Sequence, residues 1–234
     1  MDERKCLGFV LDPGQKLYAY TIPEAHPPVE IERNFRSLEH LICGQFQSAN
    51  KPKSFPTNLC LSLAIDLAYS LLQLHATAWL TESWCKKSIL FPVNEKQPYV
   101  TLAITGRPST ESSFGIERQS ILNPYLVALG IVLLELSEGK LLEVWLKDRS
   151  DITFDGTNVL DRANAARTWL MEDAKTTNKI EAYAKVITRC LDCSFNPPVQ
   201  IKTLTNASFR EAVYRDIVFQ LERMYEKSMY PLGK

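Results

Sequence analysis

The chain has 234 residues, of which 45% are hydrophobic and 23% are charged. Its 27 basic and 27 acidic side chains give a formal net charge of zero. This composition is typical of a globular protein, and it excludes a disordered chain, a collagen-like chain and the basic excess of a nucleic-acid-binding protein.

A chain of this length is expected to build a single hydrophobic core, because one core stops growing near roughly 250 residues. We therefore expect one domain over residues 1–234. The longest charge-free apolar run, Leu126–Leu134, is about half of the roughly 20 residues that cross a bilayer, so no membrane span is predicted. Residues 1–5 are charged and do not resemble a targeting signal, and the six scattered cysteines fit a reducing compartment. The resulting prediction is a cytoplasmic protein with free thiols.

The N-terminal region has the pattern of a β-hairpin. Residues 5–22 alternate in hydrophobicity on both sides of Asp12-Pro13-Gly14-Gln15, which supplies turn chemistry. The backbone groups at the edge of such a hairpin invite pairing, so we expect residues 23–36 or a second copy of the chain to cover this edge. A short helix is predicted at 37–42, after a proline-rich connector.

Two longer segments are predicted to be buried helices. Residues 59–75 and 125–136 keep the helical spacing of apolar residues, and their other faces are apolar as well, so both are expected at the centre of the molecule. Gly139 is expected to cap the second helix. Between the two helices, residues 76–122 show no long periodicity, and an irregular stretch of that length in a compact domain is usually functional.

Amphipathic helices are expected around this pair, near 157–172, 179–191 and 208–227. The last one begins with Ser208-Phe209-Arg210-Glu211, which has the pattern of a capping box, followed by an apolar face. Asn206, in a glycosylation sequon, is interpreted as a helix cap. The predicted fold class is therefore mainly α (α+β).

Common catalytic and metal-binding motifs are missing from the sequence. None of the nine glycines lies two residues from another, so no glycine-rich phosphate loop is present. Cys190 and Cys193 form a CxxC pair, but a structural zinc needs four ligands, so we interpret them as two half-buried thiols at a helix end rather than a metal or redox site. The three histidines are far apart and favour no Ser–His hydrolase, and His75 is interpreted as hydrogen-bonded to the backbone. No metal, cofactor or catalytic residue is predicted.

Several segments resemble, in the right order, the large helical lobe of eukaryotic protein kinases. Leu61–His75 resembles the kinase helix that ends in Leu-His just before the catalytic loop. Tyr125–Leu136 with Gly139-Lys140 resembles the central buried helix of that lobe. Residues 187–191 and 209–221 are similar to the last two kinase helices.

This resemblance implies a particular architecture. Residues 1–35 would be a remnant N-terminal β-hairpin and hinge, and residues 36–234 would be the helical lobe of a single kinase-like domain. The small lobe would be largely missing, because its glycine loop and its nucleotide-binding lysine would lie upstream of residue 5.

The segment after Leu74-His75 departs from the kinase catalytic loop, His-Arg-Asp-Leu-Lys-Pro-x-Asn. Thr81-Glu82-Ser83 stands where His-Arg-Asp is expected, and Ser88 stands where the magnesium-binding asparagine is expected. Phosphoryl transfer needs that aspartate to accept a proton and that asparagine to hold a magnesium ion, and serine does neither at neutral pH. Residues 91–122 also lack Asp-Phe-Gly and Ala-Pro-Glu. We therefore expect that the chain is not a protein kinase.

The spacing of Trp79, Trp84 and Pro98-Tyr99 after Leu74-His75 also resembles an uncharacterised family of kinase-like domains in filamentous fungi. Such domains are often attached to prion-inhibition or other signalling regions, and the family implies no established activity. The two tryptophans can simply fill the space that the lost ion-pair chemistry leaves. The alternative is a ligand or partner groove in this degenerate loop, whose residues would be His75, Trp79, Glu82, Ser83, Trp84 and Ser88.

Two functions are compatible with these residues. The first is a catalytically dead kinase-like domain that acts as a protein-interaction or signalling scaffold for an unknown protein partner. The second is a small-molecule-binding protein, or a cofactor-independent enzyme of fungal secondary metabolism, that uses the vacated cleft for an apolar substrate. A concave apolar pocket beside Trp79, Glu82 and Trp84 would favour the second function, and an exposed apolar patch elsewhere would favour the first.

Overall fold

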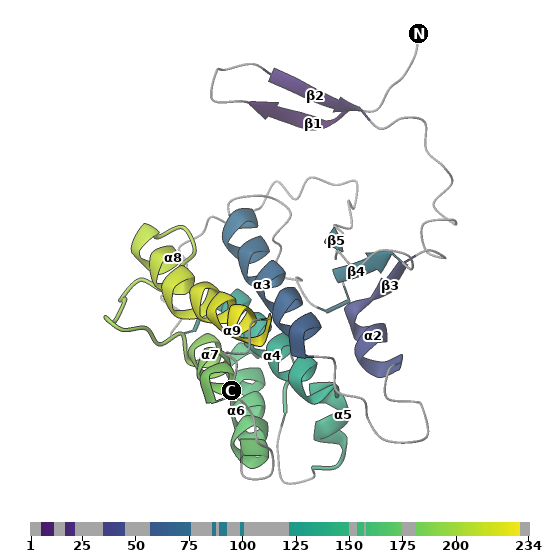
Figure 1. The fold of residues 1–234 in the computed structure, drawn as a ribbon, viewed down its shortest axis with the longest axis vertical. Coiled ribbons are helices and arrows are strands. Elements are labelled where there is room, and N and C mark those ends of the chain that lie inside the picture. The colour runs from purple at the N-terminus through teal and green to yellow at the C-terminus, as the bar shows by residue number, and fades with distance from the viewer. Residues whose placement is uncertain are drawn as a thin grey trace.

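The protein is mainly helical, as the sequence predicts (Figure 1). A computed structural model describes part of the chain, namely residues 6–11, 17–21, 35–44, 57–75, 86–87, 89–92, 99–100, 122–149, 154–156, 158–174 and 181–229. None of the helices in these ranges combines the length and the hydropathy that crossing a bilayer requires.

Helix α4 (Pro124–Glu138) forms the centre of the helical body, and every residue from Leu126 to Leu136 is buried. Its ends follow from local chemistry. The Asn123 side chain accepts hydrogen bonds from the backbone N–H groups of the first turn, and Pro124 occupies the first helical position, where no N–H is needed. Gly139 has a left-handed φ of 59° and caps the helix as predicted.

Helix α3 (Thr57–Leu74) is the second buried helix, and its predicted position is confirmed. It packs against α4 and against α9 (Phe219–Met229). The Tyr69 hydroxyl of α3 donates a 2.6 Å hydrogen bond to the Glu222 carboxylate of α9. The two segments are far apart in the sequence, so this contact holds the C-terminal helices against the rest of the helical body.

The remaining helices surround α4. Helix α6 (Val159–Ala174) and helix α7 (Glu181–Asp192) were both expected from their periodicity and pack against α4 and against each other. The short helices α2 (Leu38–Gly44) and α5 (Leu142–Lys147) complete this part of the fold. The prediction missed α5, because six residues are too few to establish a helical period.

The expected C-terminal helix is interrupted by a wider turn. It consists of α8 (Ala207–Val213), the π-helical segment η1 (Tyr214–Val218) and α9. Its expected apolar face is buried, as shown by Phe209, Val213, Ile217, Leu221 and Met224. These residues close the core between α7 and α3.

The predicted capping box at Ser208–Glu211 is wrong, and the interpretation of Asn206 as a cap is confirmed. Asn206 Oδ1 accepts a 3.0 Å hydrogen bond from the Phe209 N–H. Ser208 lies inside the first turn, because Asn206 already starts the helix two residues earlier.

The N-terminal hairpin is confirmed as the antiparallel pair β1 (Cys6–Leu11) and β2 (Leu17–Thr21). Of the residues expected to cover its edge, 23–36, residues 23–34 lie outside the described residues, and Phe35 and Arg36 pair with β4, so a cover by residues 23–34 or by a second copy of the chain stays a prediction. A second antiparallel sheet, β3 (Phe35–Ser37), β4 (Ile89–Pro92) and β5 (Tyr99–Val100), was not predicted. Strands of two to four residues carry too little alternation to be recognised in the sequence.

Candidate functional site

Of the six residues of the predicted groove, His75 is the one that lies among the described residues. Its Nδ1–H donates a 2.6 Å hydrogen bond to the Leu72 carbonyl at the end of α3, which confirms the backbone-bonded interpretation. The other five, Trp79, Glu82, Ser83, Trp84 and Ser88, lie outside the described residues. The groove that they were expected to form stays a prediction.

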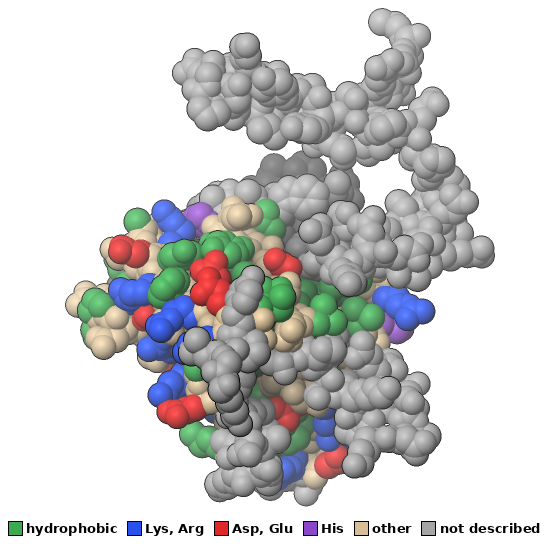
Figure 2. Space-filling view, in the orientation of Figure 1, with side chains coloured by type: hydrophobic (Ala, Val, Ile, Leu, Met, Phe, Trp, Pro, Cys, Tyr) green, Lys and Arg blue, Asp and Glu red, His purple; other side chains and the backbone are tan. Residues whose placement is uncertain are grey.

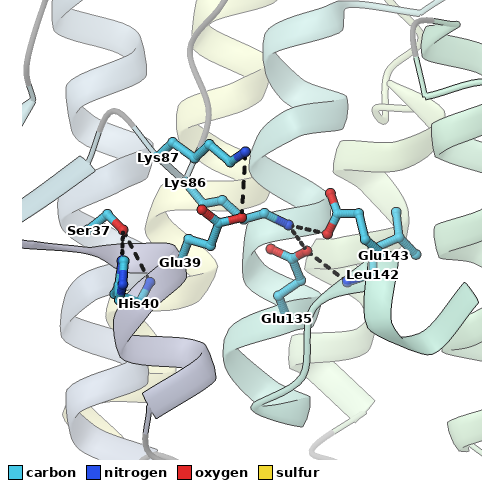
Figure 3. A network of polar contacts seen from close by, with 8 residues as sticks. All are labelled: Ser37, Glu39, His40, Lys86, Lys87, Glu135, Leu142 and Glu143. Atoms are coloured by element: carbon cyan, nitrogen blue, oxygen red, sulfur yellow. Dashed lines mark hydrogen bonds and ion pairs between the residues drawn. The ribbon is translucent and has the colours of Figure 1, made fainter. Parts of the chain in front are cut away.

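A cluster of charged side chains is centred on Lys86, which lies between Trp84 and Ser88 of the predicted groove in the sequence (Figure 3). We call it the buried charge cluster. Lys86 Nζ lies 2.5 Å from Glu135 Oε1 on α4 and 2.6 Å from Glu143 Oε2 on α5. Glu135 is fully buried, Lys86 is 7% exposed, and Glu143 is partly exposed. The lysine ammonium is therefore held between two carboxylates and joins the segment before β4 to the central helix.

The position of Glu135 explains why the cluster exists. A carboxylate inside an otherwise apolar helix is costly to bury unless it is paired and hydrogen-bonded. Its Oε1 also accepts a 2.9 Å hydrogen bond from the Leu142 N–H, whereas its buried Oε2 has no hydrogen-bond partner among the described residues. Burial therefore raises the pKa of Glu135 above its usual value, although the charge of Lys86 acts in the opposite direction.

The pKa values of Lys86 and Glu143 are shifted in the directions that favour their ion pair. Burial acts to lower the pKa of Lys86, but its bonds to the two carboxylates outweigh burial and raise that pKa. Burial likewise acts to raise the pKa of Glu143, but the hydrogen bond from Lys86 and the lysine charge lower it. Both groups are therefore charged at neutral pH.

The cluster extends to the start of α2. The Glu39 N–H donates a 3.4 Å hydrogen bond to the Lys86 carbonyl, and the Glu39 carboxylate lies 3.9 Å from Lys87 Nζ. Ser37 Oγ accepts a hydrogen bond from the His40 N–H and caps the helix. Figure 3 shows these residues side by side. Together they fasten α2, the segment before β4, α4 and α5 to one another.

The sequence contains one signal for this cluster. Glu135 is an acidic residue within the apolar run 125–136, and a buried acid requires a buried base nearby. Nothing in the sequence marks Lys86 as that base, because the two residues are separated by 49 positions.

The CxxC pair is structural. Cys190 and Cys193 are 0% and 1% exposed, so the expectation of half-buried thiols is wrong. Burial raises the pKa of both, that of Cys193 to about 11, which leaves them as unreactive thiols. Cys193 Sγ lies 3.1 Å from the Asn123 backbone nitrogen, at the start of α4. Among the described residues, no group of three or more His, Cys, Asp or Glu side chains could hold a metal ion.

The surface of the C-terminal helices is hollowed by a groove of about 480 Å³. We call it the C-terminal groove. One wall is the loop Pro197–Ile201, and the other is formed by residues of α8 and η1 and the turn before them, namely Asn206, Ser208, Glu211, Ala212 and Arg215. Ile201 is 54% exposed in it. The groove is therefore an exposed surface that is partly apolar and distant in sequence from the predicted groove.

A family model described as a domain of unknown function (DUF7580) matches residues 3–228. The chain belongs to this family. The DUF7580 match includes the hairpin β1–β2, the buried charge cluster and the C-terminal groove, so these features belong to one family domain. No curated protein and no solved structure matches the chain.

Proposed function

We propose that this DUF7580 domain is a catalytically inactive, protein-kinase-like module that binds a partner protein. The resemblance of α3 and α4 to two helices of the kinase large lobe supports the kinase-like part of the proposal. The inactive part and the binding part rest on separate features of the chain.

The observation that carries the inactive part is the buried charge cluster. Lys86 lies within the segment that aligns with the catalytic loop, between Ser83, which stands in place of the proton acceptor, and Ser88, which stands in place of a metal ligand. Phosphoryl transfer depends on an aspartate base, metal ligands and a cation near the phosphates. Lys86 Nζ donates two of its three N–H groups to carboxylates, at 2.5 and 2.6 Å, and these carboxylates compensate its charge, so we infer that this lysine serves the structure rather than phosphate binding.

The binding part is supported by the C-terminal groove, where an exposed isoleucine lies among apolar and polar residues. Figure 2 shows basic, acidic and hydrophobic side chains interspersed over the helical body, with no single sign of charge dominating that face. A surface of this kind suits a protein partner better than a nucleic acid, whose recognition needs a basic patch.

Thermal denaturation of the full chain tests the inactive part of the proposal. We expect no rise in melting temperature with ATP and Mg²⁺, because the residues that would hold them are replaced. A magnesium-dependent rise in melting temperature with ATP would contradict the proposal. A shift with lipophilic compounds instead would favour the alternative, a protein that binds an apolar small molecule.

The binding part is tested by in-cell crosslinking with the tagged full chain, followed by titration calorimetry with the purified crosslinked protein. We expect direct binding of a protein partner. If none of the crosslinked proteins binds the chain once it has been purified, this part of the proposal is contradicted.

A further inference from the structure

We propose that the buried charge cluster is a pH-sensitive device, in which the Glu135 carboxylate takes up a proton inside the folded protein as the pH falls from 7 towards 5 and leaves Glu143 as the charged partner of Lys86. This inference goes beyond the proposed function and does not depend on it. It follows from the balance of charges in the cluster, from the burial of Glu135 and from its unpartnered oxygen.

The centre of the cluster holds more negative than positive charge (Figure 3). Lys86 Nζ lies 2.5 Å from Glu135 Oε1 and 2.6 Å from Glu143 Oε2, so two carboxylates share one cation. Lys87, the next cation in the chain, is exposed and lies 3.9 Å from a third carboxylate, that of Glu39. Carboxylates that share a site favour the uptake of a proton by one of them. One proton brings the three central groups to neutrality.

Burial decides which of the two carboxylates takes the proton. The Glu143 side chain is 56% exposed, so water solvates its charge, whereas the Glu135 side chain is fully buried. Burial disfavours the charged form of a carboxyl group. It raises the pKa of Glu135, whereas the effect of burial on Glu143 is outweighed by Lys86, which lowers that pKa. The proton therefore goes to Glu135.

The two oxygens of Glu135 differ in a way that favours the neutral form. Oε1 accepts hydrogen bonds from Lys86 Nζ and from the Leu142 N–H, at 2.5 and 2.9 Å. Oε2 is buried and has no partner among the described residues. In an apolar core, a charged oxygen without a partner costs more free energy than a neutral hydroxyl does. A proton on Oε2 removes this cost, and Oε1 keeps both of its hydrogen bonds.

Other titratable groups on the elements around α4 do not change charge in this pH range. Burial raises the pKa of the Cys43 thiol on α2 and that of Cys60 on α3, the latter to about 12. Burial also raises the pKa of the Tyr183 hydroxyl on α7. All three groups are therefore neutral between pH 5 and pH 7. Arg162 of α6 stays charged, and its charge helps to lower the pKa of Glu143.

Proton uptake by Glu135 has a definite effect on stability. A carboxyl group whose pKa is higher in the folded than in the unfolded protein binds its proton more tightly in the folded protein. Its stabilising contribution is complete below the ordinary value of 4.5 and is lost as the pH rises through the raised pKa. We therefore expect this residue to stabilise the fold increasingly as the pH falls from 7 towards 5.

Urea denaturation of the full chain and of Glu135→Gln between pH 7 and pH 5 tests the proposal. Glutamine keeps the shape of the side chain but cannot take up the proton. We expect the urea midpoint of the natural chain to rise relative to that of E135Q as the pH falls. Each unit by which the folded pKa exceeds 4.5 changes the folding equilibrium constant by about tenfold. Histidines titrate in the same range, but all three are common to both proteins, so their contribution cancels.

Two further variants complete the comparison. Lys86→Met removes the cation from Glu135, so its loss of stability at pH 7 should shrink as the pH falls, and it should not shrink when Glu135 is also replaced by glutamine. Glu226→Gln is the control, because it changes an exposed acid of α9, and it is expected to keep the pH dependence of the natural chain.

Carbon-13 NMR of the Glu135 carboxyl group in the natural chain detects the proton directly and requires no variant to fold. We expect this signal to titrate above pH 4.5 in the folded protein. A Glu135 signal that titrates at or below 4.5, or an E135Q variant with the same pH dependence of stability as the natural chain, would overturn the inference, because Glu135 would then stay charged between pH 5 and pH 7.

Discussion

Lys86, whose ammonium group is buried, is the residue on which the arrangement of the site depends most. It compensates Glu135, whose carboxylate is fully buried, and it is shared with the partly exposed Glu143. Removing one member of a buried ion pair leaves an uncompensated charge, which costs far more than the pair itself contributes.

We expect Lys86→Met to lower the free energy of unfolding by about 3 kcal/mol, because Glu135 loses its buried partner. Lys87→Met is the matched control, since Lys87 is exposed and lies 3.9 Å from its acidic partner, a pair worth less than about 1 kcal/mol. Urea denaturation at neutral pH measures both. The double variant K86M/E135L, which removes both charges, should recover part of the loss. Equal effects of K86M and K87M would show that the cluster is not a buried one.

The titration of Asp216, on η1, is expected to make the stability of the protein depend on pH. Burial acts to raise its pKa, but hydrogen bonds from Arg215 and from the Asn196 N–H and the charge of Arg189 outweigh burial, and the pKa lies below the ordinary 3.8. The ionised carboxylate therefore stabilises the fold above pH 3.8, and this contribution is lost as the pH falls through the lowered pKa.

We expect Asp216→Asn to be less stable than the natural chain by about 1–3 kcal/mol at pH 7, because charged hydrogen-bond partners lose their acceptor. The difference should shrink as the pH falls below 3.8. Urea denaturation from pH 7 to pH 3 follows it. Asp148→Asn is the control, because that carboxylate is 77% exposed, and its effect should stay near zero throughout. A difference for D216N that is independent of pH would rule out this role for the carboxylate.

At the scale of the elements, the contact between α4 and α7 depends on one glycine. A Cβ added to Gly130 would lie 2.8 Å from the Cβ of Cys190 and 3.1 Å from Leu191 Cδ2. The first distance is shorter than side chains tolerate, and the Cys190 Cβ is attached directly to the backbone of α7. The two helices therefore approach closely only because residue 130 has no side chain.

We expect Gly130→Ala to destabilise the protein by about 1–3 kcal/mol, as overpacking of a well-packed core does, even though alanine favours a helix more than glycine does. Thermal denaturation followed by circular dichroism measures the effect. Gly156→Ala is the control, because its added Cβ would meet the end of the Phe154 ring at 3.3 Å, and that ring can move. A G130A variant as stable as the natural chain would mean that α4 and α7 lie further apart.

The same elements show which parts of the fold a sequence can predict. Helices α3, α4, α6 and α7 were predicted because each repeats its apolar spacing over at least 12 residues. The sheet β3–β4–β5 was missed because its strands are short and because β3 pairs with β4 across a long separation in the sequence. The π-helical segment η1 was missed because one wider turn changes the spacing of the apolar residues only slightly. The hydrophobic periodicity of the sequence does not distinguish such a turn from a continuous α-helix.

The candidate site was less predictable than the fold. His75 was interpreted correctly because its bond to Leu72 is local. The pairs Lys86–Glu135 and Arg215–Asn196 join distant segments, and no spacing rule connects them. Because Glu135 is a lone acid in an apolar helix, the sequence does indicate that it needs a basic partner. Which residue is that partner is known only from the three-dimensional fold.

At the scale of the whole molecule, one hydrophobic core connects the described helices from α2 to α9. Trp145 of α5 and Trp169 of α6 stack in it with ring centroids 5.5 Å apart. Arg149 extends this contact, because its guanidinium lies over the Trp145 ring and pairs with Glu172. A core shared in this way favours unfolding in one step.

We expect tryptophan fluorescence and far-ultraviolet circular dichroism to report a single, coincident urea transition, because a shared core couples all the helices. The chain has four tryptophans, so a Trp79→Phe/Trp84→Phe variant leaves the stacked pair of α5 and α6 as the fluorescent reporter. Its fluorescence midpoint should equal the dichroism midpoint, which averages over every helix. Two separated midpoints would mean that α5 and α6 unfold independently of α3 and α4, and that residues 1–234 contain more than one cooperative unit.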